Sequence, residues 1–318
     1  MSDSPAGPTI GLDIGGTKVL GVVLGPDGSV AREHRVPSPV SDLASLVDAC
    51  AQLVTELDGT GLPVGVGAAG LVDRDGRLTY APNIPGVRDA PLRAEIARAT
   101  GARVVVDNDA NVSALGEVTY GAARGARYAL QVTLGTGIGG GMIVGGEVYR
   151  GAYGFAGEIG HITVDVDGPL CACGEYGHWE AIASGSALGR MARELVASGR
   201  GQAVLDAAGG DREQVSGEDV ATAARAGDAD ALALVRRYAD NVALGLANLA
   251  NILDPERIVV AGGLVRMGHL LFDPLTHAFE ERLEGTEHRP AVPIVPAELG
   301  ERAGAVGAAV LARSLLGG

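Results

Sequence analysis

The sequence predicts an α/β protein with partly parallel sheets, organised as two duplicated lobes. Apolar strand-like segments alternate with helical patterns, which is typical of sheets covered by helices. A unit of strand, glycine turn and strand occurs twice, with the copies about 120 residues apart, too far for short solenoid repeats. The length of 318 residues suits roughly two domains.

The first half of the chain begins with a predicted hairpin, in which two apolar strands flank Gly15-Gly16. Helical spacing of leucine and valine follows, and then two buried strands separated by a Pro/Gly loop and a helix. We expect strands at 9–14, 19–24, 64–67 and 104–106, and helices at 43–57 and 90–100.

The second half begins with another predicted hairpin, over 129–144. A long helix is expected over 229–253, with an apolar stripe from Leu232 to Ile252, and Pro255 ends it. A strand at 257–260 and a final helix at 303–316 complete the pattern. The small, polar residues between 198 and 216 predict a mobile surface segment.

Composition and charge exclude several classes of protein. The formal charge is −14, so attraction of the whole molecule to nucleic acid or an anionic membrane is not expected. Residues 1–8 lack the features of a signal peptide, and no apolar run is long enough to span a membrane. Three cysteines do not make a disulfide framework. We expect a cytoplasmic protein.

Three glycine turns each follow an apolar strand, which predicts a nucleotide site. Glycines let backbone N–H groups face a phosphate, a threonine hydroxyl adds a donor, and a carboxylate suits nucleotide-bound Mg²⁺. The first turn alone is equally compatible with a plain hairpin, whereas three such turns favour phosphate binding. The predicted ATP-binding residues are Asp13, Gly15, Gly16, Thr17, Lys18, Gly135, Thr136, Gly137, Gly139, Gly262 and Gly263.

Polar residues cluster at the end of the strand at 104–106, in the run 107–111. Two carboxylates and two carboxamides suit sugar hydroxyls, and one carboxylate could take a proton from an attacking hydroxyl. The alternative is a helix cap rich in Asp and Asn. The position of this run between two glycine turns favours a functional role.

Two histidines and two cysteines lie within 18 residues and could supply four tetrahedral zinc ligands. They are His161, Cys171, Cys173 and His178. The alternative is a pair of unligated thiols. Cys50 lies in an apolar helical pattern and is expected in the core.

Together these motifs resemble the ROK (repressor, ORF, kinase) family of bacterial sugar kinases and regulators over nearly the whole chain. The turn at 13–18 resembles its first phosphate motif, the run 134–161 its signature, and 261–264 its adenosine motif. The resemblance implies a two-lobed actin-like ATPase (ribonuclease H-like) sugar-kinase fold with an interlobe cleft. It places one lobe at 1–110 with 301–318 and the other, with the zinc loop, at 111–300.

The resemblance also implies site residues and partners. Asp109 would be the general base for the sugar 6-hydroxyl, with ATP and Mg²⁺ as phosphoryl donor and structural Zn²⁺ in the loop. The hexose would be bound by Asn83, Asn108, Asp109, Glu158, His161 and Glu180. A homodimer is implied, with a tetramer as the alternative.

One residue departs from the family pattern, because His178 stands where the zinc motif usually has a third cysteine. Imidazole can replace a thiolate as a tetrahedral ligand, so we still predict a zinc site, with two histidines and two cysteines.

The favoured function is ATP-dependent phosphorylation of glucose. N-acetylmannosamine, fructose or allose as substrate, and polyphosphate as donor, remain alternatives. A sugar-sensing repressor is not expected, because only twelve residues precede Asp13 and the charge is acidic. A sugar binder without activity is disfavoured by the presence of Asp109 and all three turns.

Overall fold

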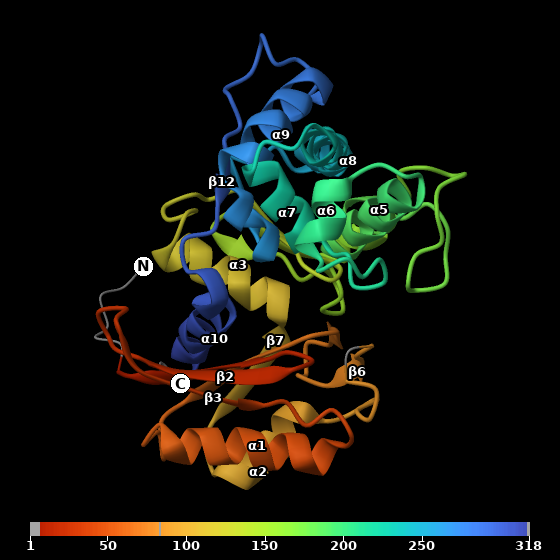
Figure 1. The fold of residues 1–318 in the computed structure, drawn as a ribbon. Helices are drawn as coiled ribbons and strands as arrows, with labels where there is room; N and C mark the ends of the chain where they lie inside the picture. The colour runs from red at the N-terminus through yellow and green to blue at the C-terminus, as the bar shows by residue number, and fades with distance from the viewer. Residues whose placement is uncertain (1–6, 83, 317–318) are drawn as a thin grey trace. The chain divides into compact units, whose positions relative to one another are not determined.

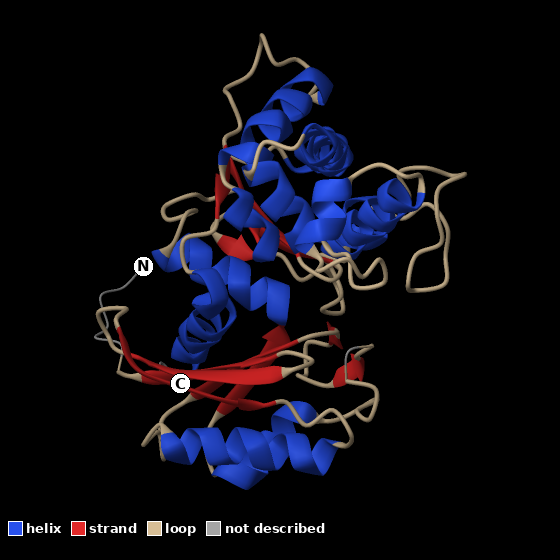
Figure 2. Cartoon of the chain, viewed as in Figure 1, coloured by secondary structure: helices blue, strands red, loops and turns tan. Residues whose placement is uncertain are grey.

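The protein forms two compact units of helices and strands, described by a computed structural model over residues 7–82 and 84–316 (Figures 1 and 2). The described residues of the first unit lie within 1–131, 141–157 and 298–318. The second unit comprises 132–140 and 158–297. The predicted α/β class is confirmed, since strands alternate with helices in both units.

The first unit contains a five-stranded mixed sheet in the order β3-β2-β1-β4-β7. The predicted hairpin is present, because β1 pairs antiparallel with β2, while β4 runs parallel to both β1 and β7. A two-stranded sheet of β5 and β6 accompanies it. The strands are β1 (Thr9–Ile14), β2 (Lys18–Leu24), β3 (Val30–Pro37), β4 (Val64–Ala68), β5 (Leu71–Val72), β6 (Leu78–Tyr80) and β7 (Val104–Asn108).

Helices cover both faces of this sheet, with α1 (Leu43–Glu56) and α2 (Leu92–Thr100) on one face and α10 (Ala303–Ala312) on the other (Figure 1). Side chains alternate along β1, so Ile10, Leu12 and Ile14 are buried in the core that contains residues of α1 and α2. The last element, α10, is shorter than predicted and continues as a short 3₁₀ turn, Arg313–Leu315.

Helix α10 packs closely against α3 (Asp109–Tyr120) through glycines. A Cβ atom added at Gly307 would lie 1.6 Å from the Val112 carbonyl oxygen and 2.8 Å from the Gly116 backbone nitrogen. The two backbones therefore approach at a distance that excludes any side chain at residue 307.

A second five-stranded sheet has the order β10-β9-β8-β11-β12. Strands β8 and β9 form the second predicted hairpin, and β11 pairs parallel with β12. The strands are β8 (Ala129–Leu134), β9 (Ile138–Val144), β10 (Glu147–Val148), β11 (Arg257–Ala261) and β12 (Ile294–Pro296).

The second unit carries six α-helices within its described residues: α4 (Glu180–Ala183), α5 (Gly185–Ala197), α6 (Gln202–Ala207), α7 (Gly217–Arg225), α8 (Ala229–Leu253) and α9 (His269–Arg282). Helix α8 has the predicted bounds, and Asp254 ends it in a left-handed conformation. Among the described residues of both units, no helix has the length and apolar character needed to cross a membrane.

Two local predictions were wrong. The segment 198–216, predicted as a mobile surface segment, contains α6, and Val204 and Val215 are buried because their apolar side chains pack into the unit. Ile252, assigned to the buried stripe of α8, is 76% exposed, because it lies in the last turn of the helix beyond the buried residues Leu249 and Ala250.

The compact units divide the chain differently from the predicted lobes, 1–110 with 301–318 and 111–300. Helix α3 belongs to the first unit because it packs against α10. Residues 141–157 also belong to that unit. The assignment of functional lobes stays a prediction.

Candidate functional site

The first glycine turn joins β1 to β2, and it places Asp13 one residue before the end of β1. The Gly15 backbone nitrogen donates to the Lys18 carbonyl at 3.0 Å, which closes the turn. Gly15 does not have a positive φ, and a Cβ added there would meet only the Lys18 oxygen, at 3.4 Å. Lys18 pairs with Glu301 at 2.6 Å on the surface. Space beside the Gly15 backbone is therefore available to a ligand.

The second and third glycine turns meet at one cavity of about 430 Å³ within the second unit. Leu134, Gly135 and Thr136 line it from the turn after β8, and Gly263 and Leu264 line it from the segment after β11. Leucine side chains and backbone amides together suit a nucleoside, since such sites combine apolar walls with a few polar groups.

Seven further residues line this cavity, and the sequence analysis missed all of them. They come from α5 and from the start of α7: Gly185, Ser186, Gly189, Arg193, Ser216, Gly217 and Glu218. The only sequence signal was a pair of small residues at the start of each helix, which capping explains equally well. Residues at the N-termini of both helices line the cavity, and the positive end of a helix dipole favours an anion there.

The Glu180 side chain is hydrogen-bonded to the backbone of the second glycine turn. Its Oε2 atom accepts a hydrogen bond from the Ile138 backbone nitrogen at 2.8 Å, and Oε1 accepts one from Cys171 Sγ at 3.5 Å. A Cβ at Gly137 would lie 2.3 Å from Oε2. Glu180 therefore holds the turn in shape, and its predicted contact with a hexose stays a prediction.

The polar run at 107–111 follows β7 and begins α3. Asn108 caps the helix, because its Oδ1 accepts from the backbone nitrogens of Ala110 and Asn111, and its amide donates to the Gly70 carbonyl. The helix-cap alternative is thus correct for Asn108, and the cap fixes Asp109 at the first helical position. Both polar atoms of the Asn108 side chain have backbone partners, and its role toward a sugar stays a prediction.

Two carboxyl groups, Asp13 and Asp109, lie close enough in the first unit to interact electrostatically. Gly67 of β4, the strand between β1 and β7, pairs in register with Asp13 of β1 and with Asp107 of β7. A Cβ added at Gly67 would lie 3.8 Å from Asp13 Oδ1 and 3.5 Å from the Asp109 Cα atom. The atom closest to such a Cβ is Val112 Cγ2, at 2.5 Å, so the absence of a side chain at Gly67 lets Val112 pack beside both groups.

Both carboxyl groups have raised pKa values. Burial, and then the negative charge of Asp109, raise the pKa of Asp13 to about 7, although Lys18 opposes the shift. Burial likewise raises the pKa of Asp109, against hydrogen bonds from Ala110 and Asn108 that lower it. A carboxylate with a raised pKa is a stronger base near neutral pH, which suits a group that accepts a proton.

We predict that Asp13→Asn changes the pH dependence of stability. The raised pKa means that the folded chain holds this proton more tightly than the unfolded chain, so stability falls as the pH rises from about 4 to about 7. The variant should melt at a higher temperature than the parent at pH 8 and show a smaller difference at pH 5. Thermal unfolding without nucleotide measures this, and equal shifts at both pH values would contradict it.

The four predicted metal ligands lie together in the second unit, with one ligand atom of each within 4.8 Å of the others. His161 Nδ1 is 3.4 Å from His178 Nδ1 and 4.0 Å from Cys171 Sγ, and Cys173 Sγ is 3.2 Å from His178 Nδ1. Tetrahedral zinc bonds imply ligand-to-ligand distances of roughly 3.3–3.8 Å. The donor set therefore suits a tetrahedral ion, and the ligand atoms that lie up to 4.8 Å apart would draw closer around it.

His161 has a nitrogen for each of its two predicted roles. Nδ1 belongs to the metal cluster, whereas Nε2 lies 3.9 Å from Glu158 Oε2. A bound ion would fix the ring and thereby the direction of Nε2. The geometry of His161 is therefore compatible both with the predicted metal bond through Nδ1 and with the predicted hexose contact through Nε2.

Trp179, between His178 and Glu180 in the chain, anchors this loop. Its side chain is fully buried, and its indole nitrogen donates to the Asn241 carbonyl of α8 at 2.9 Å. A Cβ added at Gly245 would lie 2.0 Å from the indole ring, so the ring rests directly on the α8 backbone. Asn83, the remaining predicted hexose ligand, lies outside the described residues.

Comparison with known proteins identifies the family. The model of the ROK family matches residues 9–314. The chain is 41% identical to a glucokinase of Streptomyces coelicolor, over 96% of this chain and 98% of that protein. It is 36% identical to a glucokinase of Thermotoga maritima, over 97% and 98%.

A solved structure of a ROK family protein is also similar to this chain. The ROK family glucokinase from Streptomyces griseus, crystallised with glucose and AMPPNP, superposes with a TM-score of 0.86 at 40% identity, covering 97% of this chain and all of that one. The family model and these relatives each span nearly the whole chain, and they establish that it belongs to the ROK family.

Proposed function

We propose that the protein is a glucokinase that transfers the γ-phosphoryl group of ATP to the 6-hydroxyl of glucose. The observation that carries the proposal is Asp109, a carboxylate of raised pKa fixed at the start of α3 by the Asn108 cap. Relatives of this protein in Streptomyces and Thermotoga are glucokinases, and the structure of the Streptomyces griseus relative contains glucose and AMPPNP.

In the proposed reaction, Asp109 accepts the proton of the 6-hydroxyl as that oxygen attacks the γ-phosphorus. The bond from phosphorus to the bridging oxygen breaks, which yields glucose 6-phosphate and ADP. Little covalent chemistry is asked of the protein, so orientation and charge stabilisation supply most of the rate. Mg²⁺, when bound to the nucleotide, would neutralise phosphate charge, and we assign Asp13 of the first turn as the carboxylate that would face it.

The nucleoside part of ATP is assigned to the cavity of the second unit. Its walls, Leu134 and Leu264, suit a flat base, and Glu218 offers acceptors for ribose hydroxyls. We assign phosphate contacts to the glycine turns, and hexose contacts to Asn83, Asn108, Glu158, His161 and Glu180, as the family resemblance implies. A homodimer in the cytoplasm is likewise proposed.

The function is tested by coupling ADP formation to a panel of sugars. We expect the highest kcat/KM with glucose, with lower values for N-acetylmannosamine, fructose and allose. A second series replaces ATP by polyphosphate. Preference for another sugar or donor would correct the substrate, whereas no turnover with any hexose would remove the kinase proposal.

We also propose that His161, Cys171, Cys173 and His178 hold structural zinc, which would brace the loop carrying Glu158 and Glu180. Metal analysis of purified protein should give about one zinc per chain, the stoichiometry of one four-ligand site. His178→Ala should lose zinc and melt at a lower temperature, while His277→Ala, on the exposed side of α9, keeps both. Less than half an equivalent in the parent would contradict the site.

A further inference from the structure

Asp107, directly before the proposed sugar site, is a buried carboxylate with three hydrogen-bond partners. It is 5% exposed. Its Oδ1 atom accepts from the Asn108 backbone nitrogen at 2.8 Å and from Asn111 Nδ2 at 3.0 Å. Its Oδ2 atom accepts from Arg150 Nε at 2.6 Å. Asn108 precedes Asp109 in the chain and Asn111 follows it, so the orientation of the Asp107 carboxylate influences the position of Asp109.

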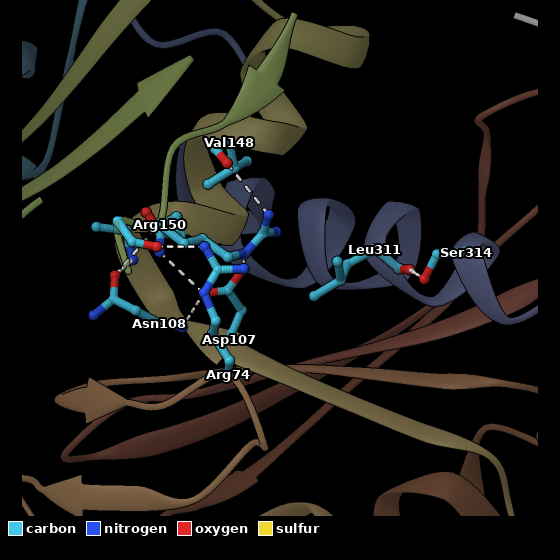
Figure 3. A network of polar contacts seen from close by, with 10 residues as sticks. Arg74, Asp107, Asn108, Val148, Arg150, Leu311 and Ser314 are labelled. Atoms are coloured by element: carbon cyan, nitrogen blue, oxygen red, sulfur yellow. Dashed lines mark hydrogen bonds and ion pairs between the residues drawn. The ribbon is translucent and has the colours of Figure 1, made fainter. Parts of the chain in front are cut away.

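Arg150 comes from a segment 43 residues away in the chain, immediately after β10. Its guanidinium also donates to the Val148 carbonyl, at 3.3 Å. Arg74 binds the same segment, by donating to the carbonyls of Gly151 and Ala152. Figure 3 shows the two arginine side chains beside Asp107. The ion pair therefore joins the segment after β10 to the end of β7.

The ion pair can be reached from solvent on one side. Arg150 is 29% exposed at its side chain and lines a cavity of about 320 Å³ in the first unit. Val106, Leu311 and Ser314 form other parts of the wall, and Asp107 lies in it too. A small planar cation could thus enter if the arginine side chain were removed.

We propose that Asp107 and Arg150 form a positioning pair that orients Asp109 for proton transfer. A buried carboxylate without its cation would turn toward other donors, and this change would release Asn108 or Asn111. The helix start that carries Asp109 would then lose its fixed geometry. The inference rests on the proposed function, because it concerns the orientation of the proposed base.

The main test is Arg150→Ala. A catalytic group displaced by about 1 Å loses up to roughly 100-fold in rate, so we expect kcat to fall by about 10- to 100-fold with little change in the glucose KM. Guanidinium chloride at low millimolar concentration should restore much of this kcat, since the cation fits beside Asp107. Sodium chloride of equal ionic strength should not. Arg98→Ala, which removes an exposed ion pair with Glu95 in α2, is the matched control and should leave kcat unchanged.

A double variant, Asp107→Asn with Arg150→Gln, covers the case in which the single variant does not fold. It removes both charges, keeps the size of the side chain at 107 and leaves a shorter polar side chain at 150, so we expect a melting temperature close to that of the parent together with a lowered kcat. Parental kcat in either folded variant would overturn the positioning role. Loss of kcat that guanidinium does not restore in a folded Arg150→Ala variant would also overturn it. An inactive parent enzyme would instead refute the proposed function.

Discussion

Asp109→Asn is expected to lower kcat for glucose phosphorylation by roughly 10²–10⁴-fold, the usual contribution of a general base. Asparagine has nearly the size of aspartate and can still accept the hydrogen bond that the Ala110 backbone nitrogen donates to Asp109 Oδ1 at 2.9 Å. The Asn108 cap and the start of α3 should therefore persist. Only the capacity to accept the hydroxyl proton is lost, so glucose should still bind.

Two measurements separate these effects. Isothermal titration should give a dissociation constant for glucose close to that of the parent, while the coupled assay shows the loss of turnover. Asp48→Asn, an exposed aspartate of α1, is the matched control and should retain full activity. A near-normal kcat in Asp109→Asn would show that another group accepts the proton.

Gly307→Ala should unfold or strongly loosen the first unit, although alanine is normally the better residue in a helix. The added methyl group would lie 1.6 Å from the Val112 carbonyl oxygen, and that atom belongs to backbone that cannot rotate away. Overpacking usually costs about 1–3 kcal/mol, and a clash with backbone should exceed this range because α3 and α10 must separate. The gain of about 1 kcal/mol in helix propensity does not offset it.

The same substitution in a helix with room provides the control. Gly189→Ala in α5 meets its nearest neighbour, an Arg193 side-chain nitrogen, only at 3.4 Å, so it should be neutral or slightly stabilising. Hydrogen exchange of peptides from α3 and α10 reports on the first unit directly. If the amide hydrogens of both helices exchange as slowly in Gly307→Ala as in the parent, the prediction is contradicted, because the helices then accommodate the methyl group at little cost in free energy.

Local patterns predicted the elements of the fold well. The two hairpins and α8 were found from alternation and helical spacing, because these signals lie within short stretches of chain. The metal cluster was found for the same reason, since its four ligands lie within 18 residues. Such features need no knowledge of the tertiary structure.

Features that depend on distant parts of the chain were missed. The walls of the cavity in the second unit come from α5 and α7, whose serines and glycines look like ordinary helix caps in the sequence. The ion pair of Asp107 with Arg150 joins the end of β7 to the segment after β10, and neither residue belongs to a motif that requires the other. The compact units also differ from the predicted lobes because packing of α3 on α10 cannot be read from either helix alone.

The burial of Trp179 has a spectroscopic consequence. It is the only tryptophan of the chain, and its indole is shielded from water against α8 while its neighbours in sequence are His178 and Glu180. Its emission should therefore be blue-shifted, and it should move to longer wavelength when the loop of His161 and His178 loosens. The protein thus carries a built-in optical reporter, free of any label, on the segment that joins the metal cluster to the second glycine turn.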